Sequence, residues 1–167
     1  MENSKILDAL KIAILMEKRG QSFYFQIAKQ TQSSEIRKIF ETMGNEEMIH
    51  EKFLKKHFIE LTKNNKLSVI ELPRVDAEEL IDLVLTDKIK KEIDAASYEA
   101  AAISAAIDME SNAIKVYSDF ANNTTDAIEK ELFTWLANWE RTHHKLLLEM
   151  DKELKESIWF DNQFWPF

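Results

Sequence analysis

Two pairs of ionisable residues share one short spacing in this chain. Glu47 precedes His50 by three positions, and Glu140 precedes His143 by the same interval. In an α-helix this spacing places a carboxylate and an imidazole on one face, about 4.5 Å apart along the axis at about 1.5 Å per residue. Because carboxylates and imidazoles both bind divalent transition metals, the two pairs indicate metal coordination.

Two further glutamates extend this pattern. Glu17 precedes Glu47 by 30 residues (47−17), and Glu110 precedes Glu140 by the same interval (140−110). All four lie on stripes of otherwise apolar residues, where burial of an unpaired carboxylate is costly and mutual repulsion should raise the pKa values. Two divalent ions would offset the four charges. One Glu from each of two helices with Glu-x-x-His from each of two others is the carboxylate-bridged dimetal arrangement of helical bundles.

Each of these residues also has an explanation that needs no metal. A single Glu on such a stripe usually marks the solvated end of a bundle, and a single core His is usually hydrogen-bonded structure. Tyr24 and Tyr117, on the same stripes, could simply pack. The joint occurrence favours a metal site, and a metal-free structural or partner-binding bundle is left as an alternative.

The candidate ligands lie within an internal repeat. Residues 13–54 align without gaps with residues 106–147, a shift of 93, and 13 of the 42 positions are identical. Unrelated sequences would share about 3. The alignment pairs Tyr24 with Tyr117 and also pairs each predicted ligand with a residue of the same type. Two repeats of two helices each, related by a pseudo-twofold axis, are therefore predicted.

The spacing of apolar residues predicts an all-α fold. Only two Gly and two Pro occur in 167 residues, too few for the turns of a sandwich or barrel. A long middle connection, at about 62–90, includes an extended stretch and a short helix at about 77–85. With short outer loops, this predicts a four-helix bundle of up-down-down-up topology over residues 1–157. An aromatic tail, 158–167, is expected to cover a bundle face or a partner chain. The long helices are expected at about 5–30, 34–61, 92–122 and from 126 onward.

Composition excludes several classes of protein. The net charge of −8 disfavours nucleic acid and anionic membranes as partners. No apolar run approaches 18 residues and the N-terminus lacks a signal-peptide core, so the cytoplasm is the expected compartment. The absence of Cys excludes thiolate metal sites and a built-in rubredoxin-type centre.

Four segments resemble the ferritin-like superfamily and, within it, the rubrerythrin-type diiron proteins: AILMEKRGQSFYFQIA, GNEEMIHEKFL, AIDMESNAIKVYSDFA and ANWERTHHKLL. The resemblance implies two iron ions, for which Mn or Zn can substitute. It assigns terminal ligands (Glu17 and Glu110), bridging ligands (Glu47 and Glu140) and one imidazole per iron (His50 for the first and His143 for the second). It also implies that Tyr24 and Tyr117 form hydrogen bonds to ligand carboxylates.

The sequence departs from the rubrerythrin pattern in two respects. The C-terminal rubredoxin domain of rubrerythrins is not expected here, because the chain has no Cys. Rubrerythrins have an additional Glu in their third helix, three residues before the position of Glu110, and this chain has Ile107 there. The redox-linked movement of one iron that the resemblance implies is therefore in doubt. Two further histidines, His57 and His144, are expected to be a packing or bundle-end residue and a surface residue respectively.

The resemblance implies a redox enzyme that reduces hydrogen peroxide or dioxygen with electrons from a separate donor protein, and a homodimer is expected. The alternative is a ferroxidase or iron-storage module of the ferritin type. Storage requires a closed multi-subunit shell, so the native mass in solution separates the two functions.

Overall fold

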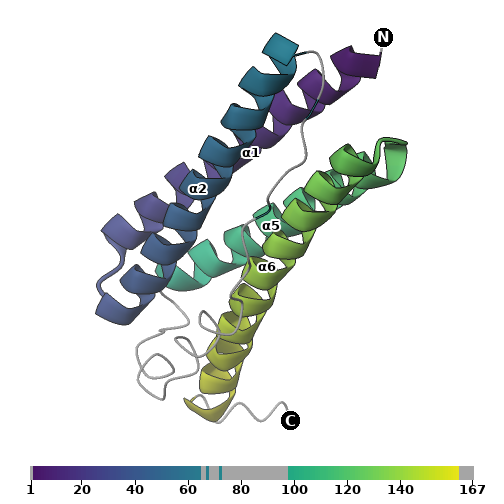
Figure 1. Ribbon diagram of the computed structural model, residues 1–167. Coiled ribbons are helices and arrows are strands. Elements are labelled where there is room, and N and C mark those ends of the chain that lie inside the picture. Colours follow the sequence, from purple (N-terminus) through teal and green to yellow (C-terminus); the bar gives the residue numbers. More distant parts are fainter. Residues whose placement is uncertain (1, 65–66, 68–71, 73–97, 162–167) are drawn as a thin grey trace.

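The computed structural model describes residues 2–64, 67, 72 and 98–161, and all four of the helices in these ranges are long (Figure 1). The predicted short helix at 77–85, most of the predicted crossover and residues 162–167 of the predicted tail lie outside the described residues. No strand occurs among the described residues. The helices are α1 (Glu2–Gln30), α2 (Ser34–Asn64), α5 (Tyr98–Asn123) and α6 (Ala127–Asp161).

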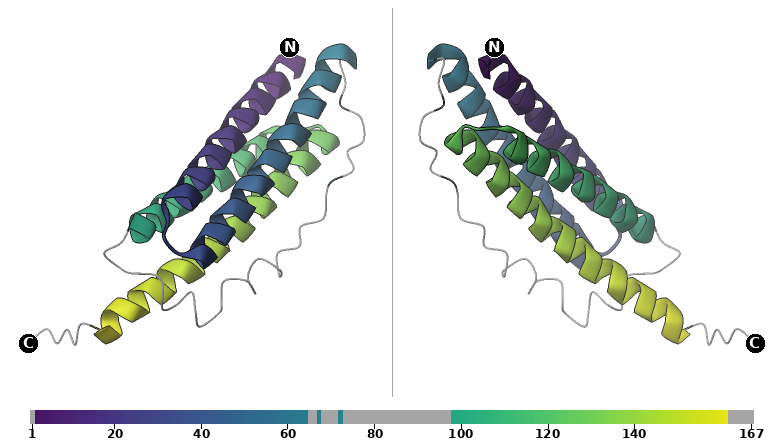
Figure 2. Two further views of the ribbon diagram at one scale, coloured as in Figure 1. Left: turned by 90° about the vertical axis from the view of Figure 1, so that its left-hand side faces the viewer. Right: turned by 90° about the vertical axis from the view of Figure 1, so that its right-hand side faces the viewer.

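The four helices form two antiparallel hairpins that pack side by side. Helix α1 pairs with α2, and α5 pairs with α6, in extensive contact along each pair. Helices α2 and α5 run in the same direction, so the order is up-down-down-up (Figures 1 and 2). The predicted all-α four-helix bundle is therefore confirmed.

The two short turns between helices follow the internal repeat. Ser33 and Asp126 are separated by 93 residues (126−33), and the side chain of each accepts a hydrogen bond from the backbone N–H three residues later, at 3.1 and 3.0 Å. These are helix N-caps, which satisfy backbone donors at the start of α2 and α6. Thr31 and Thr124 accept from the backbone N–H groups of Ser33 and Asp126, at 3.3 and 3.2 Å.

Helix α2 continues to Asn64, slightly past Thr62, where the sequence suggested the start of the crossover. The hydroxyl of Thr62 donates to the carbonyl of Phe58 at 2.7 Å, which is a helical side-chain bond. Helix α6 likewise continues to Asp161, into the predicted tail.

Two apolar clusters fill the bundle, and all four helices contribute to each. Phe40 is fully buried in the first cluster, and its repeat partner Phe133 is buried in the second. Between the clusters lies a layer in which the buried side chains are mostly polar or charged. None of the helices in the described part of the chain carries an apolar stretch long enough to cross a membrane.

Candidate metal centre

The layer between the two apolar clusters contains all six predicted ligands. Their side chains are buried in the interior of the bundle, and Glu47, the most exposed of the six, retains only 3% of its accessible surface. Helices α1 and α5 each contribute one ligand, whereas α2 and α6 each contribute two. The six are Glu17, Glu47, His50, Glu110, Glu140 and His143.

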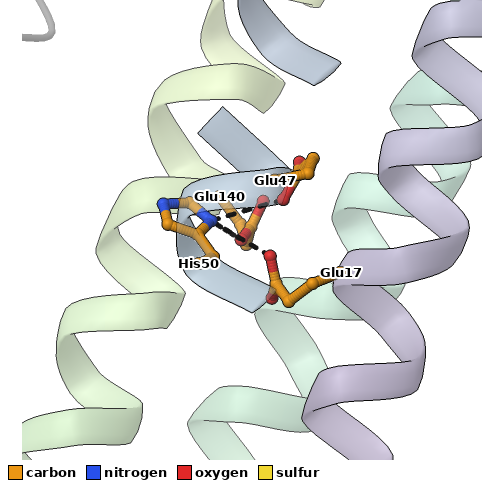
Figure 3. A group of neighbouring side chains, drawn as sticks. All are labelled: Glu17, Glu47, His50 and Glu140. Atoms are coloured by element: carbon orange, nitrogen blue, oxygen red, sulfur yellow. Dashed lines mark hydrogen bonds and ion pairs between the residues drawn. The ribbon is translucent and has the colours of Figure 1, made fainter. Parts of the chain in front are cut away.

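These side chains form two overlapping groups. In each group, one ligand atom from every member lies within 4.8 Å of the others. Figure 3 shows the first group, in which three carboxylates and one imidazole point toward a common centre. Glu47 and Glu140 belong to both groups, the arrangement that two bridging carboxylates require. The first group is Glu17, Glu47, His50 and Glu140, and the second is Glu47, Glu110, Glu140 and His143.

Both imidazoles present the same nitrogen to the carboxylates. His50 Nδ1 lies 3.0 Å from Glu17 Oε2 and 3.3 Å from Glu47 Oε2. His143 Nδ1 lies 3.2 Å from Glu47 Oε1 and 3.4 Å from Glu140 Oε2. Nδ1 is therefore the nitrogen of each ring that is placed to bind a metal ion, while Nε2 faces away from the centre.

The two tyrosines bind carboxylates across the divide between the hairpins. Tyr24 on α1 donates a hydrogen bond to Glu110 on α5, and Tyr117 on α5 donates one to Glu17 on α1. Both rings are fully buried. Burial and the neighbouring carboxylate charges raise the pKa of each phenol well above 10.0, so both remain protonated donors.

The two shared carboxylates ionise with difficulty in the absence of metal. Burial, and then the charge of Glu17, raises the pKa of Glu47 well above 4.5. Burial, and then the charge of Glu47, does the same to the pKa of Glu140. A divalent cation would remove this cost by stabilising both anions.

The expectation that all four carboxylates have raised pKa values is wrong for the other two. Burial acts to raise the pKa of Glu17, but hydrogen bonds with His50 and other neighbours, including Tyr117, outweigh it and lower the pKa. The neighbouring imidazole of His143 and the hydroxyl of Tyr24, among other groups, lower the pKa of Glu110 in the same way, against the effect of burial. The sequence could not predict this difference because it depends on which donors reach which carboxylate.

Two atoms that face the centre lack hydrogen-bond partners. Glu140 Oε1 and His143 Nδ1 are buried, and within the described ranges no group forms a hydrogen bond with either atom. A buried oxygen or nitrogen without a partner costs about 1–3 kcal/mol. Metal coordination would satisfy both, so the donor set fits a pair of divalent ions.

A glycine allows α1 to approach the centre closely. A Cβ atom on Gly20 would lie 3.3 Å from Cδ of Glu47, closer than most Cβ contacts in proteins. The other glycine, Gly44, makes room for the ring of Phe25, because a Cβ there would lie only 2.9 Å from Cε1 of Phe25.

A cavity of about 140 Å³ lies against the carboxylates, at the junction of α1 and α5. Exposed side chains of Arg19 and Asn112 form part of its lining, so it reaches the surface. Met16 and Met109, a repeat pair, also line it. A larger hollow, of about 910 Å³, lies near the N-terminal end of α1 and contains none of the predicted ligands. The predicted ligands in the lining of the smaller cavity are Glu17, Glu47, Glu110 and Glu140.

Sequence reasoning missed one residue of the centre. Glu46 Oε2 lies 2.6 Å from Nε2 of His143 and accepts a hydrogen bond from Nε1 of Trp139 at 3.3 Å. A carboxylate only accepts, so Nε2 of His143 is the donor, and Nδ1 of the neutral ring is left free for a metal. In the sequence, the only sign of a role for Glu46 is its position directly before Glu47.

The two additional histidines lie outside both ligand groups. His57 is buried, with its ring centroid 4.5 Å from that of Phe53, which agrees with a packing role. His144 is half-buried rather than fully exposed, and its Nε2 lies 3.0 Å from the hydroxyl of Ser111.

This fold and this set of side chains define a class, the ferritin-like proteins whose four-helix bundle carries carboxylates and imidazoles at its centre. The Rubrerythrin family model matches residues 8–105 and 101–163, and the chain belongs to the rubrerythrin family. None of the curated proteins and none of the solved structures compared with the chain gives a significant match.

Proposed function

We propose that this protein binds two iron ions and reduces hydrogen peroxide or dioxygen with electrons from a separate donor protein. The observation that carries the proposal is the pair of ligand groups that share Glu47 and Glu140. Membership of the rubrerythrin family supports iron as the metal, although carboxylate and imidazole ligands also accept Mn or Zn.

When bound, a pair of Fe(II) ions supplies two electrons, one from each ion. Reduction of hydrogen peroxide to two water molecules consumes two electrons and two protons, and reduction of dioxygen to hydrogen peroxide consumes the same number. The chain itself supplies ligand geometry and a buried, mostly water-excluding environment. The hydrogen bonds from Tyr24 and Tyr117 hold the carboxylates of Glu110 and Glu17 in place.

The cavity between α1 and α5 supports a very small substrate. Its volume of about 140 Å³ is well below the roughly 300–1,000 Å³ of sites that enclose drug-sized ligands. Hydrogen peroxide and dioxygen fit a cavity of this size. Since four ligand carboxylates line it, a molecule that enters from the surface arrives directly at the candidate metal positions.

The test is anaerobic loading with Fe(II), followed by stopped-flow addition of hydrogen peroxide and, separately, of dioxygen. We expect two iron ions per chain and rapid oxidation by at least one oxidant. Glu47→Gln should abolish the rapid phase, whereas Glu41→Gln, at an exposed position of α2, should leave it intact. A protein that binds no iron, or whose iron oxidises no faster than free Fe(II), would contradict the proposal.

A ferroxidase or storage role is the alternative, since the same ligands could oxidise Fe(II) as a substrate. Storage needs a closed shell of many subunits, whereas we propose a homodimer in the cytoplasm. The native mass of the iron-loaded protein decides between a dimer and a shell.

A further inference from the structure

The internal repeat is broken beside the candidate metal centre. Glu46 and Trp139 occupy equivalent positions, 93 residues apart (139−46), and each directly precedes one of the shared carboxylates, Glu47 or Glu140. One half of the centre therefore has a carboxylate where the other half has an indole. The two histidines consequently lie in different surroundings.

The outer nitrogen of His143 meets a carboxylate. Its Nε2 lies 2.6 Å from Glu46 Oε2, and Trp139 Nε1 donates to the same oxygen at 3.3 Å. The side chain of Glu46 retains 18% exposure, so its charge is only partly screened by water. Helix α2, the indole and the imidazole together fix this carboxylate in position.

The outer nitrogen of His50 meets aromatic rings instead. Its Nε2 is fully buried, and no hydrogen-bond partner for it exists in the part of the chain that the structure describes. The ring of Trp139 lies 4.6 Å from that of His50 between centroids, and the ring of Trp135 lies 5.5 Å away, both in edge-to-face geometry. Figure 3 shows this nitrogen on the side of the imidazole that faces away from the carboxylates.

This difference affects how strongly each imidazole binds a cation. A carboxylate on the outer N–H raises the basicity of the inner nitrogen and fixes the orientation of the ring. Loss of such a partner typically costs about 10–100-fold in metal affinity. Among the described residues, a carboxylate supports His143 in this way and none supports His50, although the Nδ1 atoms of the two rings face nearly equivalent sets of carboxylates.

We propose that the two metal positions are inequivalent, and that the position formed by Glu47, Glu110, Glu140 and His143 binds a divalent ion first and more tightly. Glu46 is the positioning residue responsible for the difference. This inference rests on the proposed function only in requiring that the centre binds metal. It does not depend on the oxidant or on turnover.

The test is titration of the metal-free protein with Co(II), followed by calorimetry and by visible absorption, which reports the coordination of each ion. We expect two binding steps whose dissociation constants differ by about tenfold or more. His143→Ala should remove the tighter step, whereas His50→Ala should retain it and remove the weaker step.

Glu46→Gln tests the positioning role directly, because it keeps the size of the side chain and removes its charge. The tighter step should weaken by about tenfold or more, and the weaker step should stay unchanged. Glu46→Asp, which keeps the charge, should restore part of the difference between the steps. Glu41→Gln is the matched control at an exposed position of the same helix, and both steps should persist.

The outcomes separate this inference from the proposed function. Two indistinguishable steps in the wild type, or a Glu46→Gln variant with both constants unchanged or equally weakened, would overturn the inequivalence and leave the metal centre standing. Absence of Co(II) binding to the wild-type protein would overturn both.

Discussion

Tyr117 of α5 donates a hydrogen bond to Glu17 of α1, so a carboxylate from one hairpin is held by a phenol from the other. Tyr24 and Glu110 form the reciprocal bond in the opposite direction. In each case the donor and the acceptor are buried, so water does not compete for the bond. The two tyrosines therefore both orient ligands and join the two halves of the bundle.

Replacement of Tyr117 by Phe should destabilise the metal-free protein. The change removes a donor to a buried carboxylate and raises the pKa of Glu17, which the hydrogen bond lowers. We expect the free energy of unfolding near neutral pH to fall by about 1.5–3 kcal/mol, as measured by urea denaturation. Tyr98→Phe is the control, because Tyr98 is 44% exposed, and its effect should be close to zero. Equal stability of both variants would mean that the Tyr117 bond contributes nothing.

Loss of a shared carboxylate should cost more metal than loss of an unshared one. Glu47 belongs to both ligand groups and Glu17 to only one. After iron loading and desalting, Glu47→Ala should retain neither ion, whereas Glu17→Ala should retain about one of the two. Metal analysis per chain provides the measurement. A Glu47→Ala protein that binds two ions as tightly as the wild type would disprove the bridging assignment.

The stability of the metal-free protein should depend on pH through Glu47 and Glu140. Burial, and then the charges of neighbouring carboxylates (Glu17 beside Glu47, and Glu47 beside Glu140), raise both pKa values well above 4.5, so the folded state retains protons that the unfolded state loses. Stability from this pair therefore falls as the pH rises from about 4.5 through the raised values. The pKa of His143 is raised well above 6.5, although burial alone would lower it. Folding stability from His143 is therefore also lost as the pH rises, from about 6.5 upward.

Glu17 and Glu110 act in the opposite sense, because their pKa values are lowered. Their contribution to folding stability is fully present above pH 4.5 and is lost as the pH falls through their lowered pKa values. Thermal melts of the metal-free protein from about pH 5 to pH 8 should thus show a declining Tm, and Glu47→Gln should flatten the decline.

Bound metal should reverse this trend, because coordination requires ionised carboxylates. A divalent ion at 100 times its dissociation constant should add about 2.7 kcal/mol of stability, and more as the pH rises and affinity increases. The measurement is the same series of melts with saturating Zn(II). Identical Tm values with and without metal at every pH would argue against convergence of the ligands on an ion.

Ile107 should affect the choice of oxidant. It lies one turn before Glu110, half-buried and packed against the first apolar cluster, so it presents hydrocarbon where rubrerythrins have an additional Glu. In rubrerythrins, exchange of that Glu for the His ligand on reduction favours peroxide over dioxygen. Ile107→Glu should therefore raise the ratio of the oxidation rates by peroxide and by dioxygen, and Ile107→Gln, without the charge, should not. A wild-type protein that is already strongly selective for peroxide would contradict this explanation.

The sequence predicts the bundle and the ligand set because both depend on spacing along single helices. The interval between Glu47 and His50 is a property of one helical turn, and the repeat places a second copy at Glu140 and His143. Topology follows from loop lengths. The bundle and the ligand set can therefore be predicted without knowing how one hairpin packs against the other.

Contacts between hairpins could not be predicted in the same way. Tyr24 is on the same stripe as Glu17, yet it binds Glu110, because the antiparallel packing of α1 against α5 places Tyr24 level with Glu110. Glu46 was missed for a related reason. Its repeat partner is Trp139, so Glu46 is not among the identical pairs of the internal repeat.

The division of the ligands between hairpins has a consequence for folding. Glu17, Glu47 and His50 come from the first hairpin, and the second hairpin provides the other half of the set. Each ion would therefore touch both hairpins through the shared carboxylates. Metal binding should therefore stabilise the packing of one hairpin against the other, much as a shared ion stabilises the interface between two subunits. The free energy of this packing then depends on the concentration of available metal. Amide hydrogen exchange should slow on metal binding at the surfaces where the hairpins meet, throughout the length of the bundle.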